Sequence, residues 1–134
     1  MGSPARLKLL LDTHIWLWSA LEPNRLGKNI AAELVNQKNE LWLSPISTWE
    51  ALALHRKNRI HLDGDPCAWL AEAMKNFREA SLTHEIAMEA HRLTIHTDPA
   101  DRFIAATAKV FGLTLVTADK NLLGLGDIAT LANR

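Results

Sequence analysis

Apolar residues fall into short runs separated by longer segments of mixed character. Residues 7–11 and 113–117 are nearly continuous and rich in aliphatic side chains, which is typical of parallel strands buried on both faces. Residues 40–44 alternate between polar and apolar and end before a proline, which indicates a third strand. Brief strands are also expected at residues 81–83 and 128–131.

Segments with helical spacing lie between these runs. Their expected ranges are 14–20, 30–37, about 47–58, 66–80, 84–92 and 103–111. Asp98-Pro99 places a capping side chain before a proline, which starts a helix, and Gly112 suits the left-handed position that ends one. Ser47 and Glu50 have the spacing of a capping box. The alternation predicts a three-layer α/β/α fold with a central, mainly parallel sheet of four or five short strands.

The whole chain, residues 1–134, is expected to form one domain, because its length is too small for two cores. Residues 1–6 are expected to be a flexible or expression-derived start. Lys plus Arg and Asp plus Glu each number 15, so no basic excess marks a nucleic-acid binder, although a buried acidic cluster would leave the remaining surface mildly positive. A single cysteine, Cys67, and the lack of an apolar run near ~20 residues favour a cytoplasmic protein without a membrane segment.

Four acidic residues carry the candidate chemistry: Asp12, Glu50, Asp101 and Asp119. Asp12 and Asp119 follow predicted strands, and the other two lie in the first turns of helices that begin on the same side of the sheet. Because ligands of parallel sheets bind beyond the carboxyl ends of the strands, the four carboxylates are expected to converge. Crowded carboxylates repel unless cations enter, and Mg²⁺ or Mn²⁺ suits such oxygen ligands. Each acid alone is better explained as a helix cap or first-turn residue, so the prediction depends on the set.

Four segments contain these acids: Leu10-Leu11-Asp12-Thr13-His14, Ser44-Pro45-Ile46-Ser47-Thr48-Trp49-Glu50, Asp98-Pro99-Ala100-Asp101-Arg102-Phe103-Ile104-Ala105-Ala106 and Leu115-Val116-Thr117-Ala118-Asp119. In this order they resemble the PIN-domain family, specifically its VapC-type toxin ribonucleases. The resemblance runs from about Leu7 to Asp119, nearly the whole chain. No single motif is specific, but the ordered set is.

The resemblance implies a PIN-like fold and the toxin component of a type II toxin–antitoxin system. The implied activity is that of a magnesium-dependent endoribonuclease, with Mn²⁺ able to substitute, that hydrolyses RNA phosphodiester bonds through metal-activated water. The implied partners are RNA, a VapB-type antitoxin that occupies the site and its neighbouring groove, and a second copy in a homodimer. Asp98 either joins the acidic site or caps a helix. The family's metal-site positions match Asp12, Glu50, Asp101 and Asp119, and its hydroxyl position near metal and water matches Thr117.

Basic residues near the acids have two interpretations each. Arg56, Lys57 and Arg59 either contact RNA phosphates or form a solvated end of a helix, where cations are favoured. Arg102 and Lys120 each follow one of the acids, and they either steer phosphates or offset acidic charge.

Other side chains near the acids are expected to be structural. His14 is expected to pack on the adjacent helix more than to approach substrate, and Thr13 to hold the Asp12 loop by hydrogen bonding. Trp42 and Trp49 lie in segments expected in the core.

Two rival functions remain open on the sequence. One is a receiver-like signalling domain, which also carries acids and a hydroxyl at strand ends and accepts a phosphoryl group on aspartate. The other is a non-catalytic PIN-like module that binds RNA or protein.

Overall fold

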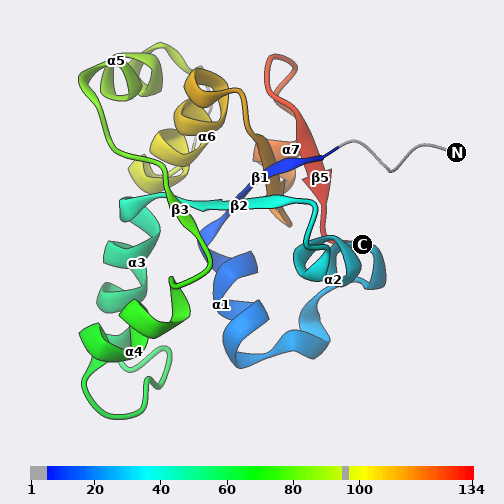
Figure 1. The fold of residues 1–134 in the computed structure, drawn as a ribbon. Coiled ribbons are helices and arrows are strands. Elements are labelled where there is room, and N and C mark those ends of the chain that lie inside the picture. Colours follow the sequence, from blue (N-terminus) through cyan, green and yellow to red (C-terminus); the bar gives the residue numbers. More distant parts are fainter. Residues whose placement is uncertain (1–5, 95–96) are drawn as a thin grey trace, which may run out of the picture.

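A computed structural model of the chain describes residues 6–94 and 97–134 and has an α/β architecture (Figure 1). Its five strands form one sheet in the order β3-β2-β1-β4-β5, and all neighbouring pairs are parallel. The predicted parallel sheet is therefore confirmed, with β1 at its centre. The strands are β1 (Lys8–Leu11), β2 (Glu40–Leu43), β3 (Arg78–Glu79), β4 (Thr114–Thr117) and β5 (Thr130–Ala132).

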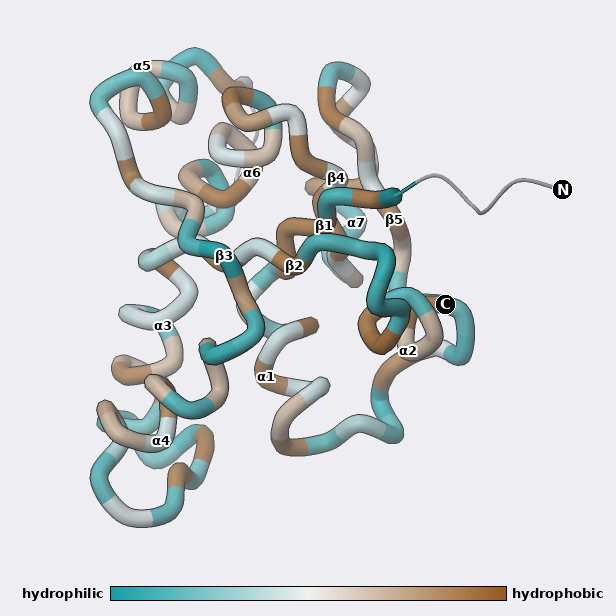
Figure 2. Tube along the Cα trace, in the orientation of Figure 1, coloured by the Kyte–Doolittle hydropathy of each residue, from teal (hydrophilic) through white to brown (hydrophobic). Residues whose placement is uncertain are grey.

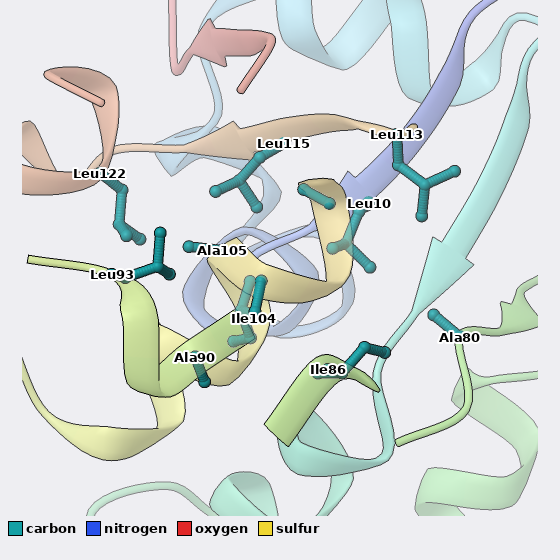
Figure 3. Close-up of a cluster of buried hydrophobic side chains, with 12 residues drawn as sticks. Leu10, Ala80, Ile86, Ala90, Leu93, Ile104, Ala105, Leu113, Leu115 and Leu122 are labelled. Atoms are coloured by element: carbon teal, nitrogen blue, oxygen red, sulfur yellow. The ribbon is translucent and has the colours of Figure 1, made fainter. Parts of the chain in front are cut away.

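Helices cover both faces of the sheet, as the three-layer prediction requires (Figure 1). Since successive side chains of a strand point to opposite faces, Leu10 packs in one core cluster, with Ile104 (Figure 3), while Leu9 and Leu11 pack in the other, with Trp16. The edge strand β3 is hydrophilic (Figure 2). The helices are α1 (Thr13–Leu21), the 3-10 turn η1 (Pro23–Arg25), α2 (Lys28–Val35), α3 (Pro45–Arg56), α4 (Pro66–Ala73), α5 (His84–Arg92), α6 (Pro99–Phe111) and α7 (Lys120–Leu123).

The segment before α5 differs from the prediction. Helix α4 ends at Ala73 instead of residue 80, and the third strand is Arg78–Glu79, so the predicted strand at residues 81–83 is wrong. The Ala80 backbone N–H donates to Leu43 O, and the edge of β2 thereby draws residues 78–80 out of helical geometry. Tertiary pairing overrides local helix propensity here.

Local start and stop signals correctly predict one helix and misplace another. Helix α6 begins after Asp98, whose carboxylate accepts a backbone N–H, and ends at Gly112, which has a φ of 65° in the left-handed region. Helix α3 instead begins at Pro45, because Ser44 is its cap. The predicted capping box of Ser47 and Glu50 is wrong, since both side chains contact Thr13 on α1.

The two ends of the described chain are tied to the body of the fold. The Arg6 guanidinium donates to Lys38 O and to Glu40, and residues 1–5 lie outside the described ranges. The flexible or expression-derived start expected for residues 1–6 stays a prediction. Arg134 O accepts the backbone N–H groups of Asn29 and Ile30 at the start of α2. No helix within the described ranges is both long and apolar enough to cross a membrane.

Candidate active site

Asp12 and Asp119 meet at the carboxyl ends of the two central strands, as the sequence predicted. Asp12 directly follows β1, and its backbone N–H donates to Val116 O of β4 at 3.0 Å. The Thr117 hydroxyl donates to Asp12 Oδ2 at 2.7 Å, and Thr117 Oγ1 accepts the Asp119 backbone N–H at 3.0 Å. One threonine thus links the two acids, and the Asp12 side chain, only 5% exposed, has a fixed orientation.

Glu50 is held by the residue that follows Asp12 in the chain. The Thr13 hydroxyl lies 2.5 Å from Glu50 Oε1 and 2.8 Å from Ser47 Oγ. A hydroxyl has one hydrogen and a carboxylate only accepts, so Thr13 donates to Glu50 and accepts from Ser47. The Thr13 hydroxyl thus contacts the second acid, 37 residues away. The Thr13 backbone N–H bonds the Asp12 carboxyl, in agreement with the expectation that Thr13 holds the Asp12 loop.

Asp101 lies in the first turn of α6 and is held at two points. Its backbone N–H donates to Asp98 Oδ1 at 3.1 Å, and its carboxylate Oδ2 accepts the Thr97 hydroxyl at 2.7 Å. Asp98 is exposed and caps the helix, so the capping interpretation of this residue is correct. Nothing in the sequence pattern indicated Thr97, because its contact depends on how the chain enters the helix.

Helix capping does not explain most of the four acids. Asp12 stands at the start of α1 but makes no side-chain cap, and Glu50 and Asp101 bond threonine hydroxyls instead of backbone donors. Asp119 is the exception, since its Oδ1 accepts the Asn121 backbone N–H at the start of α7. Asp12, Glu50 and Asp101 thus lack the helix-capping role that each of them, taken alone, suggested.

The acid cluster is defined as Asp12, Glu50, Asp101 and Asp119. Burial and mutual repulsion make the first three of these carboxyls costly to ionise. Burial raises the pKa of Asp12 and Glu50, and burial also raises the pKa of Asp101 to about 6. The charges of Asp12, Asp98 and Asp119 add to the rise at Asp101. The positive form of His14 opposes the rise at Asp12. Negative charge accumulates here, so protons or a cation would relieve the repulsion.

The donor set fits a hard divalent cation. All donors are carboxylate and hydroxyl oxygens, which Mg²⁺ and Mn²⁺ prefer. Within residues 6–94 and 97–134, no group of three or more His, Cys, Asp or Glu side chains is arranged so that it could hold a metal ion. Three of the carboxylates each accept a hydrogen bond from a threonine hydroxyl, from Thr117, Thr13 and Thr97. The convergence of all four carboxylates on one ion stays a prediction.

Arg102 does not face the acid cluster. Its guanidinium donates to the backbone oxygens of Ala90, His91 and Leu93 at 3.2, 3.3 and 3.3 Å, which caps the C-terminal end of α5. For Arg102, this structural role replaces the two interpretations that the sequence left open, which were steering phosphates and offsetting acidic charge. Lys120 is exposed beside Asp119, and both interpretations stay open for it.

Trp49 is exposed, so its predicted burial is wrong. Its side chain is 64% exposed and lines a groove of about 440 Å³ with Leu52, Met74 and Phe77. Trp49 and Leu52 also line an adjoining hollow together with the basic residues Arg56 and Lys57. Trp42 is half-buried and stacks on Phe111. The basic cluster at the C-terminal end of α3 is exposed and comprises Arg56, Lys57 and Arg59.

Comparison with known proteins gives consistent matches over nearly the whole chain. The family model of the PIN domain matches residues 9–127. Ribonuclease VapC22 of Mycobacterium tuberculosis is 35% identical over 116 residues, which cover 85% of this chain and 88% of that protein. Among solved structures, VapBC2 of Rickettsia felis bound to promoter DNA has a TM-score of 0.73 at 15% identity, covering 94% and 98% of the two chains. FitAcB of Neisseria gonorrhoeae has a TM-score of 0.66 at 24% identity, covering 92% and 96%.

Proposed function

Since this chain belongs to the PIN-domain family, we propose that it is a metal-dependent endoribonuclease and the toxin of a type II toxin–antitoxin pair. The observation that carries the proposal is the placement of Asp12, Glu50 and Asp101 at one sheet edge without a capping role. The 35% identity of this chain to a protein named as a ribonuclease supports RNA as the substrate. The receiver-like alternative finds no support in these matches.

The four residues of the acid cluster would hold Mg²⁺, with Mn²⁺ as a substitute, and Asp98 would add negative charge from the rim. A bound ion of this kind lowers the pKa of its water and stabilises charge on the phosphate. The protein's own part is to keep the carboxylates in place. The Thr117 hydroxyl holds Asp12 Oδ2 and the Thr13 hydroxyl holds Glu50 Oε1, so neither acid needs to reorient during the reaction.

The surface around α3 supports both proposed partners. Arg56, Lys57 and Arg59 offer positive charge to RNA phosphates about two turns along the helix from Glu50. The apolar groove at Trp49 suits a segment of an antitoxin, because exposed tryptophans in grooves are frequent anchors of protein interfaces. The solved VapBC2 and FitAcB structures are similar in fold to this chain and support an antitoxin of the VapB type as its partner. A homodimer of this chain is part of the same proposal.

Cleavage of RNA by purified variants tests the proposal. Asp12→Asn and Asp119→Asn are expected to lower the rate at least about 100-fold, because loss of a metal ligand costs several kcal/mol of transition-state stabilisation. Asp63→Asn is the matched control, since Asp63 is an exposed loop acid that bonds His61. Rates are compared with added Mg²⁺ and with a chelator, after circular dichroism has shown each variant folded. Folded Asp12→Asn protein that cleaves as fast as the control would refute the assignment.

A further inference from the structure

Thr97 makes a contact that the helix beside it does not need. Helix α6 already has its cap, because Asp98 Oδ1 accepts the Asp101 backbone N–H at 3.1 Å. The Thr97 hydroxyl goes instead to Asp101 Oδ2 at 2.7 Å, a distance typical of a strong hydrogen bond to a carboxylate. The bond therefore fixes the side chain of Asp101, whereas Asp98 fixes its backbone.

Charge alone would turn the Asp101 carboxylate away from the site. The carboxylates of Asp12, Asp98 and Asp119 all repel it. The adjacent Arg102 gives no compensation, because its guanidinium is committed to the backbone oxygens at the end of α5. Among the residues that the structure describes, the neutral hydroxyl of Thr97 is the side chain that donates to this carboxylate.

The two carboxylate oxygens of Asp101 have different contacts. Thr97 donates its single hydrogen to Oδ2, and within the described ranges Oδ1 has no hydrogen-bond donor. Thr117 serves Asp12 and Thr13 serves Glu50 in the same way, so the site uses one threonine for each of these three acids.

We propose that Thr97 is a positioning residue, which holds Asp101 by its Oδ2 so that Oδ1 faces the acid cluster for a divalent cation. The inference rests on the proposed function, because it assigns a role within the proposed metal site. Partners that orient metal ligands in this way contribute about 10- to 100-fold to metal affinity or activity.

Titration of metal-free protein with Mn²⁺ in a calorimeter tests this role directly. Thr97→Val keeps the shape but removes the hydroxyl, and it is expected to weaken Mn²⁺ binding about tenfold, whereas Thr97→Ser should bind like the wild type. Thr94→Val is the matched control, because Thr94 is exposed on the same connection. Thr97→Ala serves as a second deletion of the hydroxyl if the valine variant does not fold. Kinetics should show a lower kcat and an unchanged KM for RNA in the variants without the hydroxyl.

Each outcome separates this role from the metal site itself. Thr97→Val that binds Mn²⁺ as tightly as Thr94→Val, or Thr97→Ser that is as weak as Thr97→Val, would overturn the positioning role while leaving the proposed function intact. Asp101→Asn that binds Mn²⁺ like the wild type would overturn the positioning role of Thr97 and also the assignment of Asp101 to the metal site, because the metal would not use Asp101 at all. Weak binding in Asp101→Asn and Thr97→Val, with recovery in Thr97→Ser, would support the proposal.

Discussion

The molecule contains two groups of acidic side chains with opposite electrostatics. In the first, the acid cluster of Asp12, Glu50, Asp101 and Asp119, burial and repulsion raise the pKa of three carboxyls. The second, here called the Lys109 cluster, joins α5, α6 and the loop before β5. Its contacts are Lys109 Nζ to Glu89 at 2.6 Å, Lys109 Nζ to Asp127 at 2.9 Å and Arg92 to Glu89 at 3.2 Å.

Bound cationic side chains make the difference between the two groups. Hydrogen bonds from Lys109 lower the pKa of Glu89 and of Asp127, so these carboxyls are more easily ionised than free ones. In the acid cluster the contacts come from neutral threonine hydroxyls, which orient the carboxylates without removing their charge. The acids that serve the fold are paired with basic side chains of the same chain. The acids at the candidate active site keep unpaired negative charge, which an external cation can neutralise.

Metal binding should produce the largest thermodynamic difference between the groups. Mn²⁺ at about 100 times its Kd is expected to stabilise the folded state by about 2.7 kcal/mol, since the ion binds the native site and not the unfolded chain. The Tm of metal-free protein, measured with and without Mn²⁺, reports this effect. Glu89→Gln should keep the full rise and Asp12→Asn should lose it. An equal rise in both variants would mean that the ion binds elsewhere.

Removing one charge from each group should change stability in opposite directions. A pKa of about 6 at Asp101 corresponds to about 3 kcal/mol of destabilisation, but Asp101 is half-exposed, so Asp101→Asn is expected to gain only about 1 kcal/mol at pH 7.5 in chelator. The amide oxygen still accepts the Thr97 hydroxyl. Glu89→Gln should lower the free energy of unfolding, because Lys109 and Arg92 lose a charged partner. Urea unfolding measures both, and a loss of stability in Asp101→Asn would contradict the comparison.

The smallest expected effect is the pH dependence of these changes. Asp101 has a raised pKa in the folded state, so its protonation contributes to the free energy of unfolding of metal-free protein below pH 3.8. This contribution is lost as the pH rises to about 6. The gain from Asp101→Asn should therefore disappear below about pH 4. Glu89 has a lowered pKa, so its stabilisation is present above 4.5 and is lost as the pH falls. Tm values of both variants from pH 3 to 8 check the signs, and parallel profiles would refute them.

Local signals predicted the parts of the fold whose causes lie within one helical turn or one strand. Asp98-Pro99 and Gly112 mark the two ends of α6, and the aliphatic runs mark β1 and β4. Signals of the same kind failed where a distant segment competed. Ser47 and Glu50 have capping-box spacing, yet both turn to Thr13 because α1 packs beside α3.

The exposed groove and the edge strand were beyond the reach of sequence patterns for the same reason. Trp49 has the character of a core residue, and only the arrangement of α3 against residues 74–79 leaves it in solvent. Arg78 and Glu79 look helical, and only the free edge of β2 makes them a strand.

The sequence by itself determined the alternation of the longer strands and helices, although it misplaced β3 and did not indicate α7. It also determined the presence of an acid at each of four junctions, because strand and helix periodicity and the rule for parallel sheets act on local pattern. Only the tertiary structure decided how those acids are held. The Thr117 bond to Asp12 spans 105 residues and the Thr13 bond to Glu50 spans 37, so each depends on which strands and helices become neighbours. It also decided which acids keep their negative charge unpaired, since Lys109 reaches Glu89 and Asp127 while Arg102 turns to backbone oxygens. Charge pairing depends on distances between side chains far apart in the chain, and packing alone sets those distances.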